Sequence, residues 1–232
     1  MKRRSWRARI GWALTALALG FLLYQGWFLA HVIWWTENNP RSTSFMRLQE
    51  RELRRDDADF QLRHQWVDYD AISAHLKRAV VAAEDDRFMM HHGFDWHGIQ
   101  HAIERNRQRG GRIAGGSTIS QQLAKNLFLS PRRSYLRKAQ EAIITIMIES
   151  LWSKQRILEV YLNVVEWGEG VFGSEAAAQH YFGMSAARLG PAEAARLAVK
   201  LPNPRYYEHH FTPRLANHAN RVRARMQHSR IP

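Results

Sequence analysis

The stretch from 115 to 126 reads GGSTISQQLAKN and contains the clearest folding signal in the chain. Its glycines interrupt any element that precedes them, and the side-chain oxygen of Ser117 or Thr118 can then cap a helix. Apolar residues follow at the spacing of one helical face: Ile119, Leu123 and Leu127. The stretch therefore predicts an amphipathic helix that begins after a glycine-rich turn.

The same three- and four-residue spacing of apolar side chains recurs along most of the chain. It predicts helices near 71–84, 95–108, 117–129, 134–152, 154–163, 174–181, 191–200 and 214–228. Proline and glycine separate these segments, and only short strands fit between them. Because 232 residues suffice for one domain and a small attachment, we expect a single, mainly α domain.

The amino-terminal region has the composition of a membrane anchor. Residues 10–35 contain no Asp, Glu, Lys or Arg, and as a helix they would be about 39 Å long, enough to span a bilayer. Five cations precede them and favour a cytoplasmic amino terminus: Lys2, Arg3, Arg4, Arg7 and Arg9. A secretory signal peptide is the alternative, but its apolar region is usually only about 7–15 residues long. We expect a cytoplasmic basic tail over 1–9, a transmembrane helix over 10–35, a connector over 36–59 and a globular domain over 60–232.

The overall charge points to a polyanionic partner. Lys and Arg total 34 against 21 Asp and Glu, which gives a formal net charge of +13. The five cations at residues 1–9 belong to membrane topology, so the remainder carries 13 − 5 = +8. Since that remainder is expected outside the inner membrane, nucleic acid is not an expected partner. The absence of cysteine excludes disulfides, thiolate metal sites and a cysteine nucleophile.

Three consecutive carboxylates, Glu84, Asp85 and Asp86, follow the apolar run 79–83 at the carboxyl end of a predicted helix. The helix dipole and mutual repulsion both disfavour negative charge at this position. Glu84 lies nearest the apolar run, so we expect burial to raise its pKa towards the range of a general base. The alternative is a solvated acidic turn.

Other polar clusters have weaker signals. The residues at 91, 92, 95 and 97 are His, His, Asp and His, but no second ligand cluster accompanies them, so their spacing does not predict a metal site. The glycines at 110 and 115 have the spacing of a phosphate-binding loop, but Gly116 stands where that motif needs Lys. Thr118, Gln122 and Lys125 share one helical face, which is either a ligand-facing stripe or the solvated side of an amphipathic helix.

A dense basic cluster follows Pro131 and consists of Arg132, Arg133, Arg137 and Lys138. Glu141 stands four residues after Arg137, at the edge of an apolar stretch, but an ion pair in this order contributes only about a few tenths of a kcal/mol. A structural pair therefore does not account for four cations. They suit a diphosphate, which Arg can bind bidentately. Glu84 and Glu141 are thus two candidate carboxylates beside one cationic cluster.

Five ordered motifs lie between residues 84 and 183. They are Glu84-Asp85-x-x-Phe88-x-x-His91-x-Gly93-Phe94-Asp95, the stretch 115–126, Arg137-Lys138-x-x-Glu141, Lys154-x-x-Ile157-Leu158-Glu159-x-Tyr161-Leu162-Asn163, and Ala176-Ala177-Ala178-x-x-Tyr181-Phe182-Gly183. Together they resemble peptidoglycan glycosyltransferase family 51, whose members polymerise lipid II, and specifically its monofunctional biosynthetic transglycosylases. Ser120 departs from the Thr that the family often has, and it keeps the hydroxyl.

The resemblance implies a mainly α, lysozyme-like glycosyltransferase domain attached to one N-terminal transmembrane helix. It implies that Glu84 is the general base that deprotonates the GlcNAc 4-hydroxyl of lipid II. This hydroxyl would attack C1 of the donor MurNAc, forming a β-1,4 bond with inversion and releasing undecaprenyl diphosphate. Glu141 would be a second essential carboxylate on the donor side. The resemblance assigns substrate binding to Lys125, Arg133, Arg137, Lys138, Ser117, Thr118, Gln122 and Asn126, with Asp85, Phe88 and His91 supporting the first motif.

The resemblance implies no tightly bound cofactor, although Mg²⁺ or Mn²⁺ could assist at the diphosphate. It implies a single-pass protein of the bacterial inner membrane with a cytoplasmic amino terminus and a periplasmic catalytic domain. Expected partners are lipid II, the lipid-linked nascent glycan, the membrane, and other cell-wall synthesis or division proteins. No Ser is followed by Lys three residues later, so a penicillin-binding transpeptidase is not expected.

Two rival functions fit part of the sequence. A lytic or lysozyme-type enzyme would also use a catalytic Glu, but it would have no lipid diphosphate for the basic cluster to bind. An anchored, non-enzymatic scaffold would explain the anchor and the charge, but not the paired carboxylates.

Overall fold

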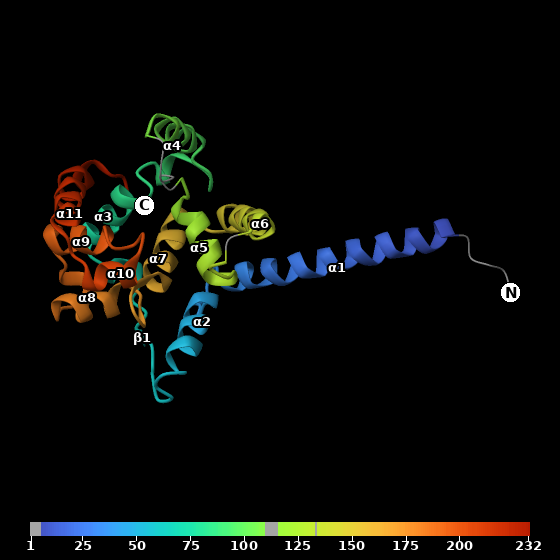
Figure 1. Ribbon diagram of the computed structural model, residues 1–232, viewed down its shortest axis with the longest axis horizontal. Coiled ribbons are helices and arrows are strands. Elements are labelled where there is room, and N and C mark those ends of the chain that lie inside the picture. The colour runs from blue at the N-terminus through green and yellow to red at the C-terminus, as the bar shows by residue number, and fades with distance from the viewer. Residues whose placement is uncertain (1–5, 110–115, 133) are drawn as a thin grey trace. The chain divides into compact units, whose positions relative to one another are not determined.

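The computed structural model describes residues 6–109, 116–132 and 134–232. The chain divides into two compact units, Met1–Asn38 and Asn39–Pro232. The first unit contains α1 (Trp6–Trp34), a single long helix (Figure 1). Its segment Ala8–Trp34 contains an 18-residue window with a mean hydropathy of 1.6 and is long and apolar enough to cross a membrane. This agrees with the anchor expected from the uncharged run 10–35.

The second unit is mostly helical, as the apolar spacing predicted. Its helices are α2 (Ser44–Leu53), α3 (Ala74–Glu84), α4 (Trp96–Arg109), α5 (Ile119–Phe128), α6 (Tyr135–Leu151), α7 (Lys154–Val164), α8 (Ser174–Phe182), α9 (Pro191–Ala198), α10 (Pro204–His209) and α11 (Pro213–Arg225). Short 3₁₀ turns include η2 (Phe88–Met90) and η4 (Met226–His228). The periodicity predicted α3 to α9 and α11, whereas α2 and α10 were not predicted.

A small sheet joins distant parts of this unit. Its strands are β1 (Arg63–His64), β2 (Glu166–Gly168) and β3 (Val171–Phe172), in the order β1-β3-β2. β1 runs parallel to β3, with Arg63 opposite Val171, and β2 runs antiparallel to β3. The turn between β2 and β3 contains Gly170 at φ 68°, where a side chain would collide with the ring of Phe60. The sheet thereby ties the segment before α3 to the segment after α7.

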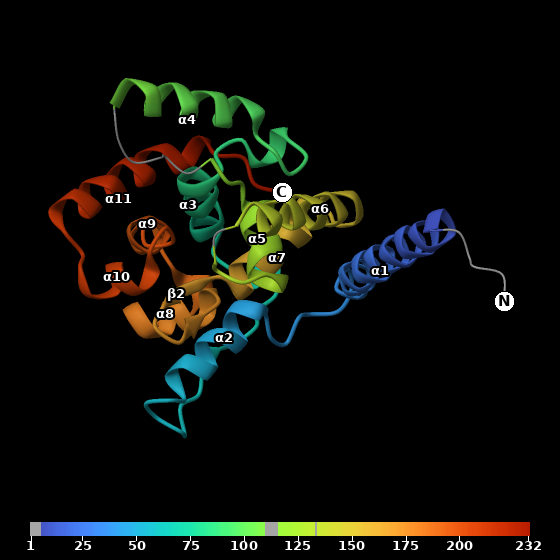
Figure 2. The ribbon, with the colours of Figure 1, turned by 45° about the vertical axis from the view of Figure 1, so that its right-hand side comes forward.

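Two groups of helices provide most of the core. α5 packs against α6, α7 and α2, and α3 packs against α9 and α11 (Figure 2). Large apolar side chains are fully buried in both groups, including Leu123 and Ile148 in the first and Leu76 and Val222 in the second. Because each such side chain stabilises the fold by about 1.5–3 kcal/mol, these helices are firmly held. The carboxyl end of α3 and the amino end of α5 therefore have fixed positions.

The segment 36–59, expected to be a connector, contains a packed helix. Thr43 caps α2 by accepting a hydrogen bond from the amide of Met46 at 3.1 Å. Met46 and Gln49 are buried, and α2 contacts α5. The folded unit therefore begins near Asn39, before the expected boundary at residue 60. This helix was not predicted because charged residues occupy its exposed face and give the segment the polar composition of a connector.

Candidate active site

The polar site begins at the carboxyl end of α3. Ser73 caps the start of this helix by accepting a hydrogen bond from the amide of His75. Apart from Lys77, its buried residues are apolar up to Ala82, and Glu84 is its last residue. Asp85 then leaves the helical conformation, with φ −159° and ψ 69°. The sequence thus places a carboxylate where a packed helix ends, as expected from the run 79–83.

Glu84 accepts a hydrogen bond from a side chain of α5. Nε2 of Gln122 lies 2.8 Å from Oε2 of Glu84. Burial is the largest effect on the Glu84 carboxyl and raises its pKa. The hydrogen bond from Gln122 lowers this pKa, the negative charge of Asp85 raises it further, and the positive charge of Lys125 lowers it. Glu84 is therefore a desolvated carboxylate with one neutral donor, a combination suited to a general base. The solvated acidic turn is not what the structure shows at Glu84.

Asp85 has a different task, because both of its oxygens have partners. Oδ1 lies 2.9 Å from Nε2 of His91, and Oδ2 accepts a hydrogen bond from the amide of Ile119 at 3.0 Å. The amide of Gly93 donates to Nδ1 of His91, so the proton of His91 lies on Nε2 and is donated to Asp85. Asp85 thus joins the end of α3 to the first turn of α5, where the helix dipole favours an anion.

The start of α5 is fixed by a capping box. The hydroxyl of Thr118 accepts a hydrogen bond from the amide of Gln121, whose side chain in turn binds the amide of Thr118. The same hydroxyl donates to the carbonyl of Gly93 at 2.7 Å. Gly93 has φ 88°, and a Cβ there would lie 2.7 Å from Cγ2 of Thr145. Thr118, predicted to bind substrate, is buried and holds this turn instead of presenting a free hydroxyl.

The second candidate carboxylate, Glu141, lies on α6 among cations. Its side chain is 3% exposed. Nη1 of Arg137 lies 2.6 Å from Oε2, and Nζ of Lys138 binds Oε1. Nζ of Lys138 also lies 3.4 Å from the hydroxyl of Ser117. Arg137 and Glu141 form the ion pair that their i,i+4 spacing allows, and Lys138 is the second cationic partner of this buried carboxylate.

Lys125 links the two carboxylates electrostatically. Burial is the largest effect on the ammonium group of Lys125 and lowers its pKa. The negative charges of Glu141 and Glu84 raise this pKa, and the positive charges of Arg137 and Lys138 lower it. The cation therefore lies within the fields of both carboxylates. The ring of Phe45, on α2, lies 5.5 Å from Nζ of Lys125. No local pattern in the sequence connects Phe45 with Lys125, because the contact depends on the packing of α2 on α5.

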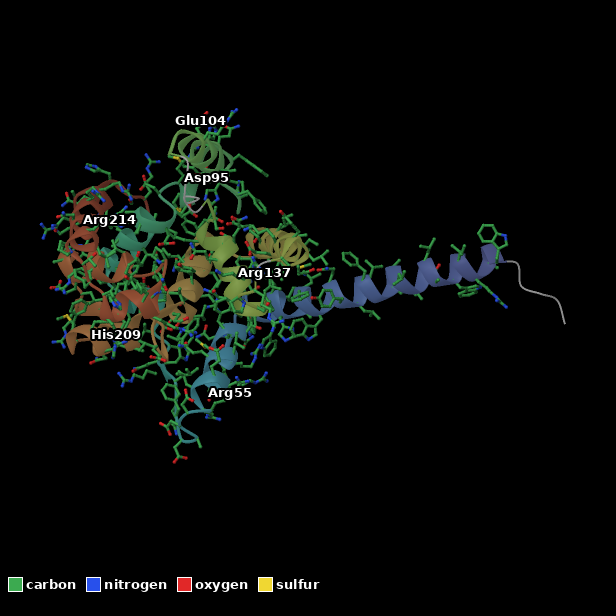
Figure 3. The ribbon with its side chains drawn as sticks, viewed as in Figure 1. Arg55, Asp95, Glu104, Arg137, His209 and Arg214 are labelled. Carbon is green, nitrogen blue, oxygen red and sulfur yellow. The ribbon has the colours of Figure 1, made fainter. Side chains whose placement is uncertain are left out.

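The remaining predicted residues divide into buried supports and exposed polar groups. Phe88 is fully buried, and the ammonium of Lys154 lies 4.5 Å from its ring centre. Asn126 is buried on α5, whereas Ser117 is exposed. Arg133 lies outside the described residues. The view with side chains shows Arg137 at the α6 side of the folded unit, away from Arg214 on α11 (Figure 3).

Tyr161 belongs to a motif that the resemblance implies shapes the cleft and the core, and no local pattern in the sequence connects it with Glu84. Its hydroxyl donates to Oε1 of Gln122 at 2.9 Å, so it contacts the residue that binds Glu84. A buried tyrosine at helical spacing is usually a core residue, so only the structure could find this link.

The described residues do not form a protein cage for a metal ion. Among them, no group of three or more His, Cys, Asp or Glu side chains is arranged to hold one. Both ring nitrogens of His91 are engaged in hydrogen bonds, Nε2 with Asp85 and Nδ1 with the amide of Gly93. These side chains therefore do not fit a resident divalent cation.

Comparison with known proteins agrees with the motifs. A family model described as Transglycosylase matches residues 51–227. The chain is 65% identical over 223 residues to the biosynthetic peptidoglycan transglycosylase of Azoarcus sp. (strain BH72), covering 96% of each chain. It is 64% identical over 222 residues to the protein of the same name from Aromatoleum aromaticum, again covering 96% of each. The corresponding protein of Methylobacillus flagellatus is 54% identical over 233 residues and covers 100% of both chains. With the family model spanning most of the chain, and relatives sharing more than half of its residues along almost their whole length, the chain belongs to the biosynthetic peptidoglycan transglycosylase family.

Proposed function

We propose that the protein polymerises lipid II by transferring the lipid-linked nascent glycan from its undecaprenyl diphosphate to the GlcNAc 4-hydroxyl of an incoming lipid II. The observation that carries this proposal is the desolvated carboxylate of Glu84 together with a buried carboxylate, Glu141, that binds two cations, both carboxylates acting on the same Lys125. One part of such a site can take up a proton, and the other can hold a charged leaving group.

Glu84 is the general base in this proposal. A raised pKa brings a carboxyl closer to neutral pH and strengthens it as a proton acceptor. Gln122 occupies Oε2, and no described residue donates a hydrogen bond to Oε1. Oε1 takes the proton of the 4-hydroxyl as its oxygen attacks C1 of the donor MurNAc. Direct displacement inverts the configuration, so an α-linked donor gives a β-1,4 bond.

The cations around Glu141 bind the leaving diphosphate. Glu141 holds Arg137 and Lys138 on one side of α6, and Lys125 approaches from α5 within its field. Three cations against two carboxylates leave a positive charge for the substrate to neutralise. Arg137 suits two phosphate oxygens at once, and the lysines act as point charges. Arg133, Ser117 and Asn126 are further proposed substrate contacts.

No step of this mechanism passes through a metal ion, because the described side chains do not fit one. If Mg²⁺ or Mn²⁺ assists, its ligands would be the oxygens of the diphosphate itself, since hard cations prefer oxygen.

The anchor places this chemistry at a membrane. α1 is apolar enough to span, and basic residues precede it. We propose a cytoplasmic amino terminus and a catalytic unit on the periplasmic side of the inner membrane, where lipid II and the nascent chain share the bilayer. Other cell-wall synthesis or division proteins are proposed partners, whereas nucleic acid is not. We propose no transpeptidase activity, because no Ser in the sequence is followed by Lys three residues later.

The test is a polymerisation assay with labelled lipid II. Glu84→Gln should lower the rate by a factor of about 100 to 10,000, as expected for loss of a general base. Asp86→Asn is the matched control, because it changes a neighbouring exposed carboxylate to an amide and should keep the rate. The product should be digested by lysozyme. Near-normal turnover by Glu84→Gln would contradict the base assignment, and shortening of preformed glycan would indicate a lytic enzyme instead.

A further inference from the structure

A hydrogen-bonded chain leads from the core of the folded unit to Glu84. Tyr161 lies on α7 and is 0% exposed. Its hydroxyl donates to Oε1 of Gln122 at 2.9 Å, and Nε2 of Gln122 donates to Oε2 of Glu84 at 2.8 Å. The three side chains come from three helices, α7, α5 and α3.

The direction of donation in this chain is fixed by its ends. An ionised carboxylate can only accept, so the amide must turn its NH₂ group towards Glu84. The amide oxygen then faces Tyr161, whose hydroxyl must donate. Burial, with the charges of Glu84 and Asp85, raises the pKa of Tyr161 well above its usual range, so its hydroxyl stays protonated and remains a donor.

Building on the proposed role of Glu84, we propose that Tyr161 is a positioning residue of the active site: its hydroxyl holds the Gln122 amide so that the NH₂ group faces Glu84 and favours the ionised carboxylate. Without the hydroxyl, the amide can rotate and present its oxygen to Glu84. An amide oxygen accepts from a protonated carboxyl and repels an ionised one, so the rotated amide would favour the protonated form of the base.

The charged groups near Glu84 do not replace the hydrogen bond from Tyr161 to Gln122. Asp85 disfavours ionisation of Glu84, and Lys125 favours it. Arg225, on α11, binds the carbonyl of Ala82 in the last turn of α3, and Asp86 accepts from Ser229. These four charged residues remain when the hydroxyl of Tyr161 is removed. A change in the pH dependence of the Tyr161→Phe variant would therefore be caused by loss of the hydroxyl.

The experiment is the pH profile of kcat for lipid II polymerisation by the full-length protein. In Tyr161→Phe, the acid limb should move to higher pH by about one pH unit, which is a tenfold loss of kcat at any pH on that limb. Activity should recover at higher pH. A purely structural role would lower kcat by the same factor at every pH and leave the limb in place.

Tyr181→Phe is the matched control. Its hydroxyl donates to the carbonyl of Trp167 at 2.8 Å, so the substitution removes an equally short hydrogen bond that does not involve Glu84. This variant should keep the wild-type acid limb. Gln122→Leu provides the second variant, and it should move the limb in the same direction even if Tyr161→Phe does not fold. The double variant should move it no further than Gln122→Leu alone, because both act through one chain.

Three results would overturn the inference: an unshifted acid limb in folded Tyr161→Phe, a double variant with additive shifts, or a wild-type profile without an acid limb. The Glu84→Gln assay separates this failure from failure of the proposed function. If Glu84→Gln is inactive and the limb of Tyr161→Phe does not move, the base assignment stands and only the role of Tyr161 is wrong.

Discussion

Glu84, Asp85 and Asp86 are chemically similar neighbours that the fold uses in three ways. Glu84 is desolvated and accepts from Gln122, Asp85 is bound at both oxygens, and Asp86 is exposed and accepts from Ser229. Glu84 combines a raised pKa with an oxygen, Oε1, to which no described residue donates. The difference between the three comes from their partners, because their intrinsic pKa values are alike.

The buried charge of Glu84 should cost stability at neutral pH. Because the pKa of Glu84 is raised in the folded state, the folded protein binds the proton more tightly than the unfolded chain. Stability is therefore lost as pH rises from the ordinary carboxyl pKa through the raised one. Glu84→Gln lacks this titration and should have a higher Tm than the wild type at neutral pH.

Thermal unfolding of both proteins at several pH values checks this. The Tm advantage of Glu84→Gln should shrink as pH falls below the ordinary carboxyl pKa, where both states of the wild type are protonated. A constant advantage across the pH range would show that burial of the charge is not its cause.

Lys125 should contribute to binding of the diphosphate in particular. Lys125→Ala, in an inactive Glu84→Gln background, is expected to weaken binding of lipid II by about tenfold or more, because a hydrogen bond to a charged group contributes about 1.5–3 kcal/mol. Binding of the lipid-free disaccharide, which lacks the diphosphate, is the control and should change little. Equal losses for both ligands, measured by titration, would contradict the assignment.

At the scale of elements, α3 is held by residues that follow it by more than a hundred positions. The guanidinium of Arg225 donates to the carbonyl of Ala82, one of the last carbonyls of α3, which lack partners within the helix. A cation at this end also offsets the helix dipole, which disfavours the carboxylates that follow. η4 packs on α3, with Met226 buried. This contact explains how three carboxylates are tolerated at a helix carboxyl terminus.

Arg225→Ala should therefore destabilise the fold. It leaves a buried carbonyl without its donor, a change that costs about 1–3 kcal/mol in the free energy of unfolding. Arg221→Ala, on the same helix and exposed, is the control and should stay within about 0.5 kcal/mol of the wild type. Urea unfolding measures both. Equal stabilities would show that water replaces Arg225 without loss.

The sequence predicted the helices better than their contacts. Apolar spacing is a local property, so it identified α5 and placed Glu84 at the end of α3. Asp85 with the amide of Ile119, and Phe45 with Lys125, are contacts between distant segments that no local spacing encodes. α2 was taken for a connector because its exposed charges outnumber its buried residues. The family motifs placed residues of distant segments in one expected site, and two of these residues, Glu84 and Gln122, are in contact.

At the scale of the whole molecule, the charge of +13 separates into regions with different tasks. Five cations lie within residues 1–9, before the uncharged run 10–35. In the site of this peptidoglycan glycosyltransferase, Arg137 and Lys138 bind Glu141, and Lys125 lies within the fields of both Glu141 and Glu84. A third group lies on and after α11, where residues 209–232 contain five arginines and no acidic residue. The high pI of the chain is therefore spread over three regions and does not by itself identify one binding surface.

The amino-terminal cations should determine membrane orientation. Residues 1–9 contain five cations, whereas residues 36–45, on the other side of α1, contain only Arg41. Because loops rich in Lys and Arg stay in the cytoplasm, the amino terminus should remain inside. A phosphatase that is active only in the periplasm should work when fused to the carboxyl terminus and fail at the amino terminus.

Replacing the five cations by Gln removes the difference in positive charge between the two ends of the span. It should reduce the activity of the carboxyl-terminal phosphatase at constant protein level. Replacing Arg214, Arg221, Arg223 and Arg230 removes four cations far along the chain from α1 and should leave orientation unchanged, since only charges near the ends of a span are effective. If both sets of replacements had the same effect, total charge rather than its position would govern insertion.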